Sequence, residues 1–236
     1  KLCNTHDIVC LQEHWLLPNE LHNLNSVHSD FYGFGMSAVD VESNVLRGRP
    51  YDGTGILYRK SIVSTVSIID SINDRVTAIK VTSYDLCLIV ACVYMPTDYS
   101  DCDSLDDYVE TCSYGESMLD DSDINQFCII GDMNCSQESR FFPILNQLAI
   151  SNYLNFTDMR LLSNAVTYVR DDGMHESWID HVLCSQNIDN NVNSMSVLND
   201  YIISDHRPLS FCLNCNISCD DMSHIVMFYF EKIYLG

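Results

Sequence analysis

Short apolar runs recur along most of the chain, and four of them end in acidic or histidine-containing motifs. In chain order these motifs are Leu11-Gln12-Glu13, Gly131-Asp132-Met133-Asn134, Ile179-Asp180-His181 and Ser204-Asp205-His206-Arg207-Pro208. Each run has the length of a strand, so a folded sheet can gather the four motifs at one edge. Carboxylates for a divalent cation, an imidazole oriented by a carboxylate and an amide for a substrate oxygen suit chemistry on phosphate.

The apolar content is sufficient for one large domain. The 236 residues are 47% apolar, so an α/β core can form without disulfides or metal. The longest apolar run, Leu86 to Met95, is well short of the roughly 18 residues that span a bilayer. We therefore predict a soluble protein with no membrane partner.

The cysteines favour a reducing compartment. Most of the 12 cysteines lie within apolar, strand-like runs, where a free thiol behaves as a small hydrophobic group. Disulfide frameworks belong instead to small secreted domains. The sequon Asn134-Cys135-Ser136 overlaps one of the acidic motifs, and a glycan there would block the predicted site. These observations predict an intracellular protein, either nuclear or cytoplasmic.

The net charge of −21, from 33 acidic and 12 basic residues, restricts how a phosphate ligand can be held. Nucleic-acid binding normally relies on Lys and Arg, and no basic patch is evident in the sequence. A phosphate ligand must therefore be held mainly by bound metal and local donors. Much of the acidity lies between Asp98 and Asp123, which we interpret as a solvated helix with its flanks.

Strand-like runs outnumber helical ones, and the helices fall between strands. Helices are predicted at 18–24, 104–119 and 137–148. Strands are predicted at 8–11, 31–38, 55–59, 62–69, 75–82, 86–94, 127–130, 165–169, 178–184, 192–198 and 208–213. The four strands between residues 55 and 94 are spaced as an antiparallel meander. The pattern predicts two sheets packed face to face with helices outside.

The motif order resembles the endonuclease/exonuclease/phosphatase superfamily, and within it the apurinic-type endonuclease domains of non-LTR (LINE-like) retrotransposons. The resemblance covers Ile8 to Leu213 and implies a four-layer α/β sandwich, with two packed mixed sheets flanked by helices. Residues 1–213 would form this domain, with 214–236 as a tail outside the match. Besides the four motifs above, the matching segments are Gly53-Thr54-Gly55-Ile56, Val93-Tyr94-Met95-Pro96, Thr167-Tyr168 and Ser177-Trp178.

The resemblance implies a metal site and a phosphate-binding group. Glu13 ends a buried strand, where a carboxylate is costly to desolvate unless it is paired or metal-bound. The matching Glu of the family is the principal Mg²⁺ ligand, and Asp205 resembles the second carboxylate on the metal side. Mn²⁺ is an alternative ion. Tyr94 matches a phosphate-contacting Tyr, although its position at the end of an apolar strand also suits a core residue.

The resemblance assigns proton transfer to the remaining motifs. Asp132 and Asn134 alternate along what we predict to be one extended segment, so their side chains point the same way. The matching Asp orients or deprotonates the attacking water, and the matching Asn donates to the scissile phosphate. In the other half, Asp180 would hold His206 in one tautomer and stabilise its charged form.

Two further groups of residues have alternative interpretations. Trp178 and Tyr168 suit stacking on a base, and packing explains them equally well. Three cysteines and a histidine near the end of the sequence resemble a zinc knuckle. We give this interpretation less weight, because their spacing departs from the usual pattern and the first cysteine lies in a predicted strand. Its residues would be Cys212, Cys215, Cys219 and His224.

Members of the superfamily begin with a strand carrying an Asn beside the metal site, and the sequence given starts after it. We therefore predict an open sheet edge, a missing first strand and a fragment whose activity is in doubt. A Mg²⁺-dependent DNA-nicking endonuclease is the first hypothesis, with a reverse transcriptase domain as a candidate neighbour in a longer polyprotein and the oligomeric state left open. The alternatives are a phosphomonoesterase or phospholipid/inositol phosphatase of the same fold, and a non-catalytic relic.

Overall fold

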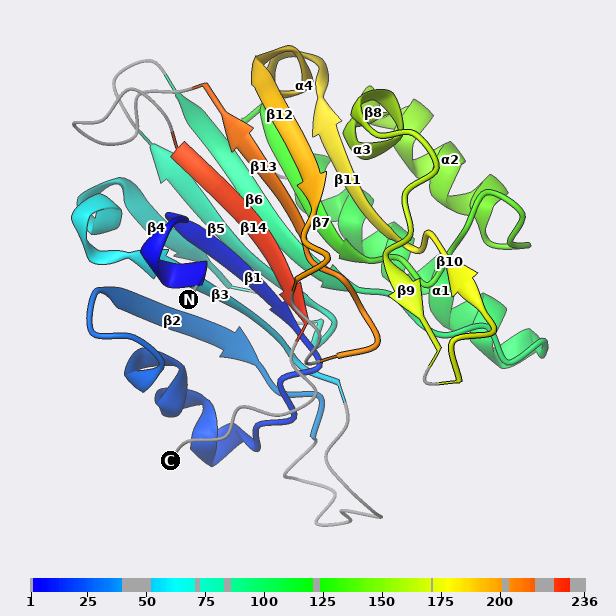
Figure 1. Ribbon diagram of the computed structural model, residues 1–236, viewed down its shortest axis with the longest axis horizontal. Helices are drawn as coiled ribbons and strands as arrows, with labels where there is room; N and C mark the ends of the chain where they lie inside the picture. Colours follow the sequence, from blue (N-terminus) through cyan, green and yellow to red (C-terminus); the bar gives the residue numbers. More distant parts are fainter. Residues whose placement is uncertain are drawn as a thin grey trace.

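The computed structural model describes most of the chain. The described residues are 2–39, 52–70, 73–82, 86–120, 124–170, 172–200, 204–214 and 223–229. Two six-stranded sheets dominate this part, and a two-stranded ribbon lies at one end (Figure 1).

The first sheet has the strand order β12-β13-β14-β1-β3-β2. Strands β1 and β14 are parallel, and the other neighbours are antiparallel. The strands are β1 (Ile8–Gln12), β2 (Phe31–Met36), β3 (Thr54–Arg59), β12 (Val192–Val197), β13 (Leu209–Leu213) and β14 (Ser223–Tyr229).

The second sheet has the order β4-β5-β6-β7-β11-β8, with β6 and β7 parallel and the other neighbours antiparallel. Its strands are β4 (Val66–Ile69), β5 (Val76–Thr82), β6 (Cys87–Tyr94), β7 (Phe127–Asp132), β8 (Leu154–Phe156) and β11 (Asp180–Ser185). Strands β9 (Tyr168–Val169) and β10 (Glu176–Ser177) form the ribbon.

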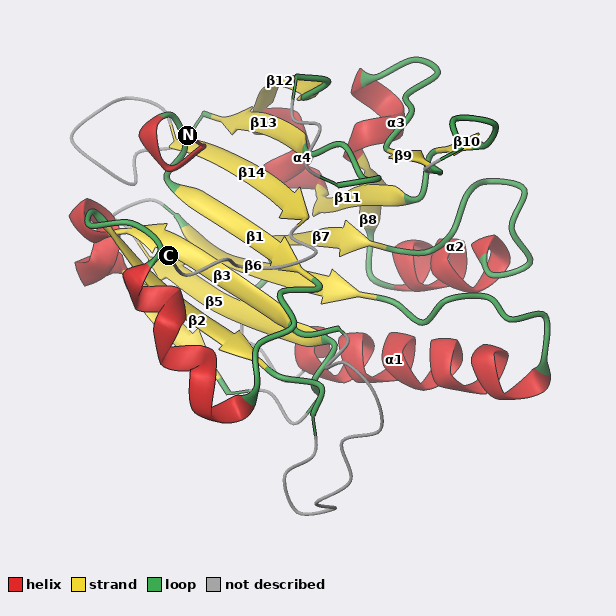
Figure 2. Ribbon diagram, turned by 60° about the horizontal axis from the view of Figure 1, so that its bottom comes forward, coloured by secondary structure: helices red, strands yellow, loops and turns green. Residues whose placement is uncertain are grey.

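The longer helices cover the outer faces of the two sheets (Figure 2). The α-helices are α1 (Cys102–Asp120), α2 (Phe142–Ser151), α3 (Thr157–Leu161) and α4 (Gln186–Asn191), and the 3-10 helices are η1 (Leu2–Asn4), η2 (Pro18–Ser26) and η3 (Lys60–Thr65). Among the described residues, no helix combines the length and apolarity needed to cross a membrane.

The hydrophobic core consists of three layers of contacts. The inner faces of the sheets pack together through residues such as Ile8, Ile56 and Val90. The other face of the second sheet packs on α1 and α2, where Tyr108 and Leu145 are buried. The outer face of the first sheet packs on η1 and η2. Alternating side chains supply both faces of each sheet, and the predicted four-layer sandwich is confirmed.

Several predictions of secondary structure differ from the structure. Residues 62–69 were predicted as one strand, but the 3-10 helix η3 precedes the short strand β4. The meander contains β4, β5 and β6 only, since β3 pairs in the other sheet. Helix α2 begins at Phe142 instead of residue 137, because Pro143 lacks an N–H and belongs in a first turn.

The predicted open edge beside β1 is wrong. Strand β1 pairs with β3 on one side and with β14 on the other, and β14 in turn pairs with β13. Strand β14 comes from the segment 214–236, which was predicted as a tail outside the domain. The backbone hydrogen bonds of β1 are thereby satisfied on both sides, which removes the exposed edge.

Candidate active site

Adjacent strands of the second sheet bring three predicted residues side by side. Tyr94 ends β6 and is in register with Asp132 at the end of β7, and Asp132 is in register with Asp180 at the start of β11. All three side chains are buried. Gly131 allows β7 to lie this close to β6, because a Cβ there would meet the Val93 carbonyl oxygen at 1.8 Å.

Asp180 and His206 form a buried ion pair. The His206 Nδ1 atom lies 3.0 Å from Asp180 Oδ2, and the two side chains are 8% and 0% exposed. Burial disfavours the charged imidazolium, but Asp180, Asp132 and Asp205 outweigh it and raise the pKa of His206 to about 9. The Tyr168 ring packs edge-on against His206 at 5.0 Å, and the two residues also share a β-bridge. Tyr168 thus supports the imidazole by packing.

Glu13 reaches the same edge from the first sheet. It follows β1 in a left-handed conformation, with φ of 51°, and its Oε2 accepts a hydrogen bond from the Trp15 indole at 3.3 Å. Burial raises the pKa of Tyr94, and the charges of Glu13 and Asp132 together with a hydrogen bond to Glu13 raise it further. Glu13, Tyr94 and Asp132 therefore form one electrostatic cluster.

Two residues of this edge were not predicted from the sequence. Arg75 pairs with Asp52 at 3.3 Å, and its guanidinium lies 5.5 Å from the centre of the Tyr94 ring. Burial raises the pKa of Asp52, Arg75 opposes the shift and Glu13 adds to it. Both residues stand in turns before strands, where a charged side chain is usually a solvated one, so the sequence carries no distinctive signal for them.

Asn134 lies beside the cluster but not on an extended segment as predicted. Strand β7 ends at Asp132, and Asn134 has a left-handed φ of 45°. Its N–H donates to Asp132 Oδ1 at 2.8 Å, and its side-chain amide donates to the Met95 carbonyl at 2.7 Å. The alternation argument failed because an Asx turn replaces the strand here. The second hydrogen of the amide remains suited to a substrate oxygen.

The donor set fits a hard divalent cation. Ligand atoms of Asp132, Asp180 and His206 lie within 4.8 Å of one another. Glu13 adds a half-exposed carboxylate through its contact with Tyr94. Asp205 is half-buried and accepts a hydrogen bond from Ser204 at 3.1 Å. Clustered carboxylate oxygens are the ligands that Mg²⁺ prefers.

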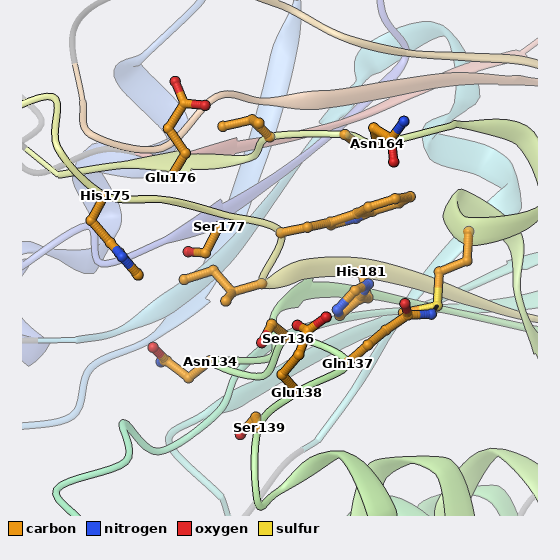
Figure 3. Close-up of a pocket in the computed structure, with 15 residues that line it drawn as sticks. Asn134, Ser136, Gln137, Glu138, Ser139, Asn164, His175, Glu176, Ser177 and His181 are labelled. Carbon is orange, nitrogen blue, oxygen red and sulfur yellow. Dashed lines mark hydrogen bonds between the residues drawn. The ribbon is translucent and has the colours of Figure 1, made fainter.

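A pocket of about 710 Å³ opens beside Asn134 (Figure 3). Its lining mixes polar and apolar groups and includes Ser136, Glu138, His175 and Trp178. The Trp178 ring stacks on His181 with centroids 6.1 Å apart, so it both packs and lines the pocket. A cavity of this size, next to the carboxylates, has room for part of a substrate.

The predicted zinc alternative is left without a described site. Cys215 and Cys219 lie outside the described residues, and the side chain of His224 is not among those described. The ten cysteines within the described part of the chain, Cys212 among them, are all free thiols. This agrees with the prediction that the core cysteines act as small hydrophobic residues.

The fold is a two-sheet α/β sandwich, and a site of carboxylates and a histidine lies at one end of its sheets. Together these two features define a class of protein. Residues 1–206 match the model of the Endonuclease/Exonuclease/phosphatase family, and the chain belongs to that family. No curated protein gives a significant sequence match.

Many solved structures share this fold, and three of them illustrate the likeness. An AP endonuclease, LMAP from Leishmania major, has a TM-score of 0.71 at 12% identity and covers 86% of this chain and 77% of its own. The 3' phosphatase NExo (D146N) from Neisseria, bound to a product DNA hairpin, has a TM-score of 0.65 at 16% identity. The match covers 86% of this chain and 87% of the NExo chain. The endonuclease domain of TRAS1, a telomere-specific non-LTR retrotransposon, has a TM-score of 0.62 at 12% identity. The match covers 89% of this chain and 99% of the TRAS1 chain. At these identities the likeness shows the fold.

Proposed function

We propose that the chain is a Mg²⁺-dependent phosphodiester hydrolase, and that it is the DNA-nicking endonuclease of a non-LTR retrotransposon. The observation that carries the proposal is the gathering of Tyr94, Asp132 and the Asp180–His206 pair at one sheet edge, with Glu13 facing them from the other sheet. The family match supports hydrolysis of a phosphoric ester. The likeness to the TRAS1 domain supports the retrotransposon assignment.

In this mechanism water attacks the phosphorus atom in line with the departing oxygen. Glu13, with Asp205, would hold the metal ion, and Mn²⁺ is an alternative to Mg²⁺. When bound, the ion neutralises the charge that grows on the phosphoryl group. We assign the ion to these two carboxylates because His206 Nδ1 already engages Asp180, and a metal there would compete with that bond.

The protein's own groups handle the proton and orient the phosphate. Asp132 receives the water proton, and His206, which a pKa of about 9 keeps protonated at neutral pH, stabilises the transition-state charge, with Asp180 holding the imidazole. Asn134 and Tyr94 donate to the phosphate oxygens. The raised pKa of Tyr94 suits this role, because the hydroxyl keeps its proton at neutral pH.

One observation favours a second candidate, hydrolysis of a small phosphomonoester such as an inositol phosphate. With 33 acidic and 12 basic residues, the chain repels a DNA backbone. A compact monoester needs only the metal and a few local donors. We rank DNA first because the pocket beside Asn134 extends the site beyond a single phosphate.

A nicking assay distinguishes these candidates. The chain is incubated with supercoiled plasmid and Mg²⁺, with the His206→Ala variant as the matched control, and in parallel with inositol phosphates. We expect relaxation of the plasmid by the wild-type chain and its loss in the variant. Nicking that persists in His206→Ala refutes the site. Turnover of inositol phosphates alone supports the second candidate, and turnover of neither indicates a catalytically inactive relic.

A further inference from the structure

A second Asp–His pair lies behind the candidate site and takes no part in the mechanism above. Asp158, at the start of α3, and His181, on β11, are both fully buried, and their Oδ2 and Nδ1 atoms are 2.7 Å apart. The other carboxylate oxygen of Asp158 accepts the N–H of Val182 at 3.0 Å. Two bonds therefore fix the carboxylate, and the carboxylate fixes the ring.

The far side of the His181 ring contacts the backbone next to Asn134. Its Nε2 lies 2.8 Å from the carbonyl oxygen of Cys135. A carboxylate and a carbonyl both accept hydrogen bonds, so the geometry uses both ring nitrogens as donors. His181 thus links Asp158 to the residue that immediately follows Asn134. Figure 3 shows His181 and Asn134 lining the same pocket.

The linked segment is a tight turn that needs such anchoring. Asn134 has a left-handed φ of 45°, a conformation that few residues other than glycine, asparagine and aspartate adopt. The turn is bonded before Asn134 by Met133, whose N–H donates to the Ile179 carbonyl and whose own carbonyl accepts the Tyr108 hydroxyl. The bond from His181 to Cys135 holds it on the other side.

We propose that His181, held by Asp158, is a positioning residue that fixes the Asn134 amide for the transition state. This inference rests on the proposed function. His181 lines the same pocket as Asn134, and its hydrogen bond toward Asn134 is the one to the Cys135 carbonyl, so the effect passes through that carbonyl and the Asn134 backbone. Losing that anchor lowers the fraction of molecules in which the amide is correctly placed, which reduces kcat and leaves KM nearly unchanged.

Two substitutions of His181 separate its two hydrogen bonds. The amide of Asn occupies roughly the place of Nδ1, so His181→Asn keeps a partner for Asp158 and loses Cys135. The longer Gln reaches the place of Nε2, so His181→Gln retains a donor to Cys135 and serves as the conservative rescue. Leu183→Ala is the matched control, because Leu183 is fully buried on the same face of β11 and belongs to the helix-side core.

The first measurement is a double-mutant cycle with Asn134→Ala, using steady-state nicking in Mg²⁺. We expect His181→Asn to lower kcat about tenfold, with KM within about twofold. His181→Gln recovers most of that loss, and Leu183→Ala lowers the melting temperature with kcat unchanged. In the Asn134→Ala background, His181→Asn has no further effect. An equal tenfold loss in both backgrounds overturns the proposal.

The second measurement is independent of activity. Hydrogen exchange of the Asn134 amide, followed by NMR, reports the turn directly, since that N–H is bonded to Asp132. We expect faster exchange in His181→Asn but not in Leu183→Ala. If the wild-type chain cleaves no phosphoric ester, the proposed function fails, and this exchange alone decides the anchoring. Unchanged protection of Asn134 in His181→Asn overturns the inference.

Discussion

Strand β11 carries two carboxylate–imidazole pairs on its two faces, and their surroundings differ. Asp180 shares the inter-sheet face with Val182, whereas His181 shares the helix side with Leu183. We call Asp180–His206 the front pair and Asp158–His181 the rear pair. The front imidazole is 8% exposed and faces further carboxylates. The rear pair is fully buried.

The comparison shows that an aspartate–histidine pair suits catalysis or anchors the backbone, depending on the groups that surround it. Burial opposes the charge of His206 and of His181, and a carboxylate raises the pKa of both. The front pair has excess negative charge from Asp132 and Asp205 nearby, which suits a cation or a developing phosphoryl charge. In the rear pair, protein groups are hydrogen-bonded to both ring nitrogens of His181, so these nitrogens stabilise the fold and are not available to a substrate.

Removing the front carboxylate should have the largest effect. In Asp180→Asn the shape is kept, but the imidazole loses the partner that fixes its tautomer and charge. We expect kcat to fall about 1,000-fold, equivalent to about 4 kcal/mol, with the melting temperature changed far less. Single-turnover nicking and thermal unfolding measure the two quantities. A variant that keeps its activity would place the chemistry elsewhere.

Removing the rear carboxylate should mainly cost stability. Asp158→Ala leaves a fully buried His181 without its carboxylate and the Val182 N–H without its acceptor. We expect the free energy of unfolding to fall by about 3 kcal/mol, as is usual when one member of a buried pair is deleted. Urea unfolding gives the value, and Asp106→Asn on the exposed face of α1 is the control. A change below about 0.5 kcal/mol would contradict this.

The sequence predicted the front pair but not the rear pair, for a physical reason. Asp180 and His206 stand in short motifs at strand ends, and a motif at a strand end has a predictable place at a sheet edge. Asp158 stands in a loop-rich stretch, and nothing local indicates that α3 will lie against β11. His181 was given no role, although its position next to Asp180 already placed it on the opposite face.

The errors elsewhere have the same origin. Residues 62–69 and 137–148 were predicted from apolar spacing, and a 3-10 turn and Pro143 decided the outcome instead. Strand β14 was missed because its place between β1 and β13 depends on contacts distant in sequence. Local patterns gave the element types and the two-sheet architecture, while pairing partners depended on tertiary contacts.

The front pair should also make stability depend on pH. The pKa of His206 is about 9 in the folded chain and about 6.5 when unfolded, so the folded state binds the proton more tightly. The stabilisation is complete below pH 6.5 and is lost as the pH rises through 9. In EDTA, the stability difference between the wild-type chain and His206→Gln should shrink by about 2.6 kcal/mol from pH 6.5 to 9. A constant difference would show that the pair is not ionised.

The smallest expected effect is the difference between the two pairs in metal binding. Only the front pair faces the cluster that includes Glu13, so Mg²⁺ at about ten times its Kd should stabilise the wild-type chain by about 1.4 kcal/mol. The same gain is expected in His181→Asn, because the rear pair has no part in holding the ion. Glu13→Gln should lose most of the gain, as seen in melting temperatures with and without Mg²⁺. If Glu13→Gln responds to Mg²⁺ like the wild-type chain, the ion is held by Asp132, Asp180 and His206 instead, and the front pair is itself the metal ligand.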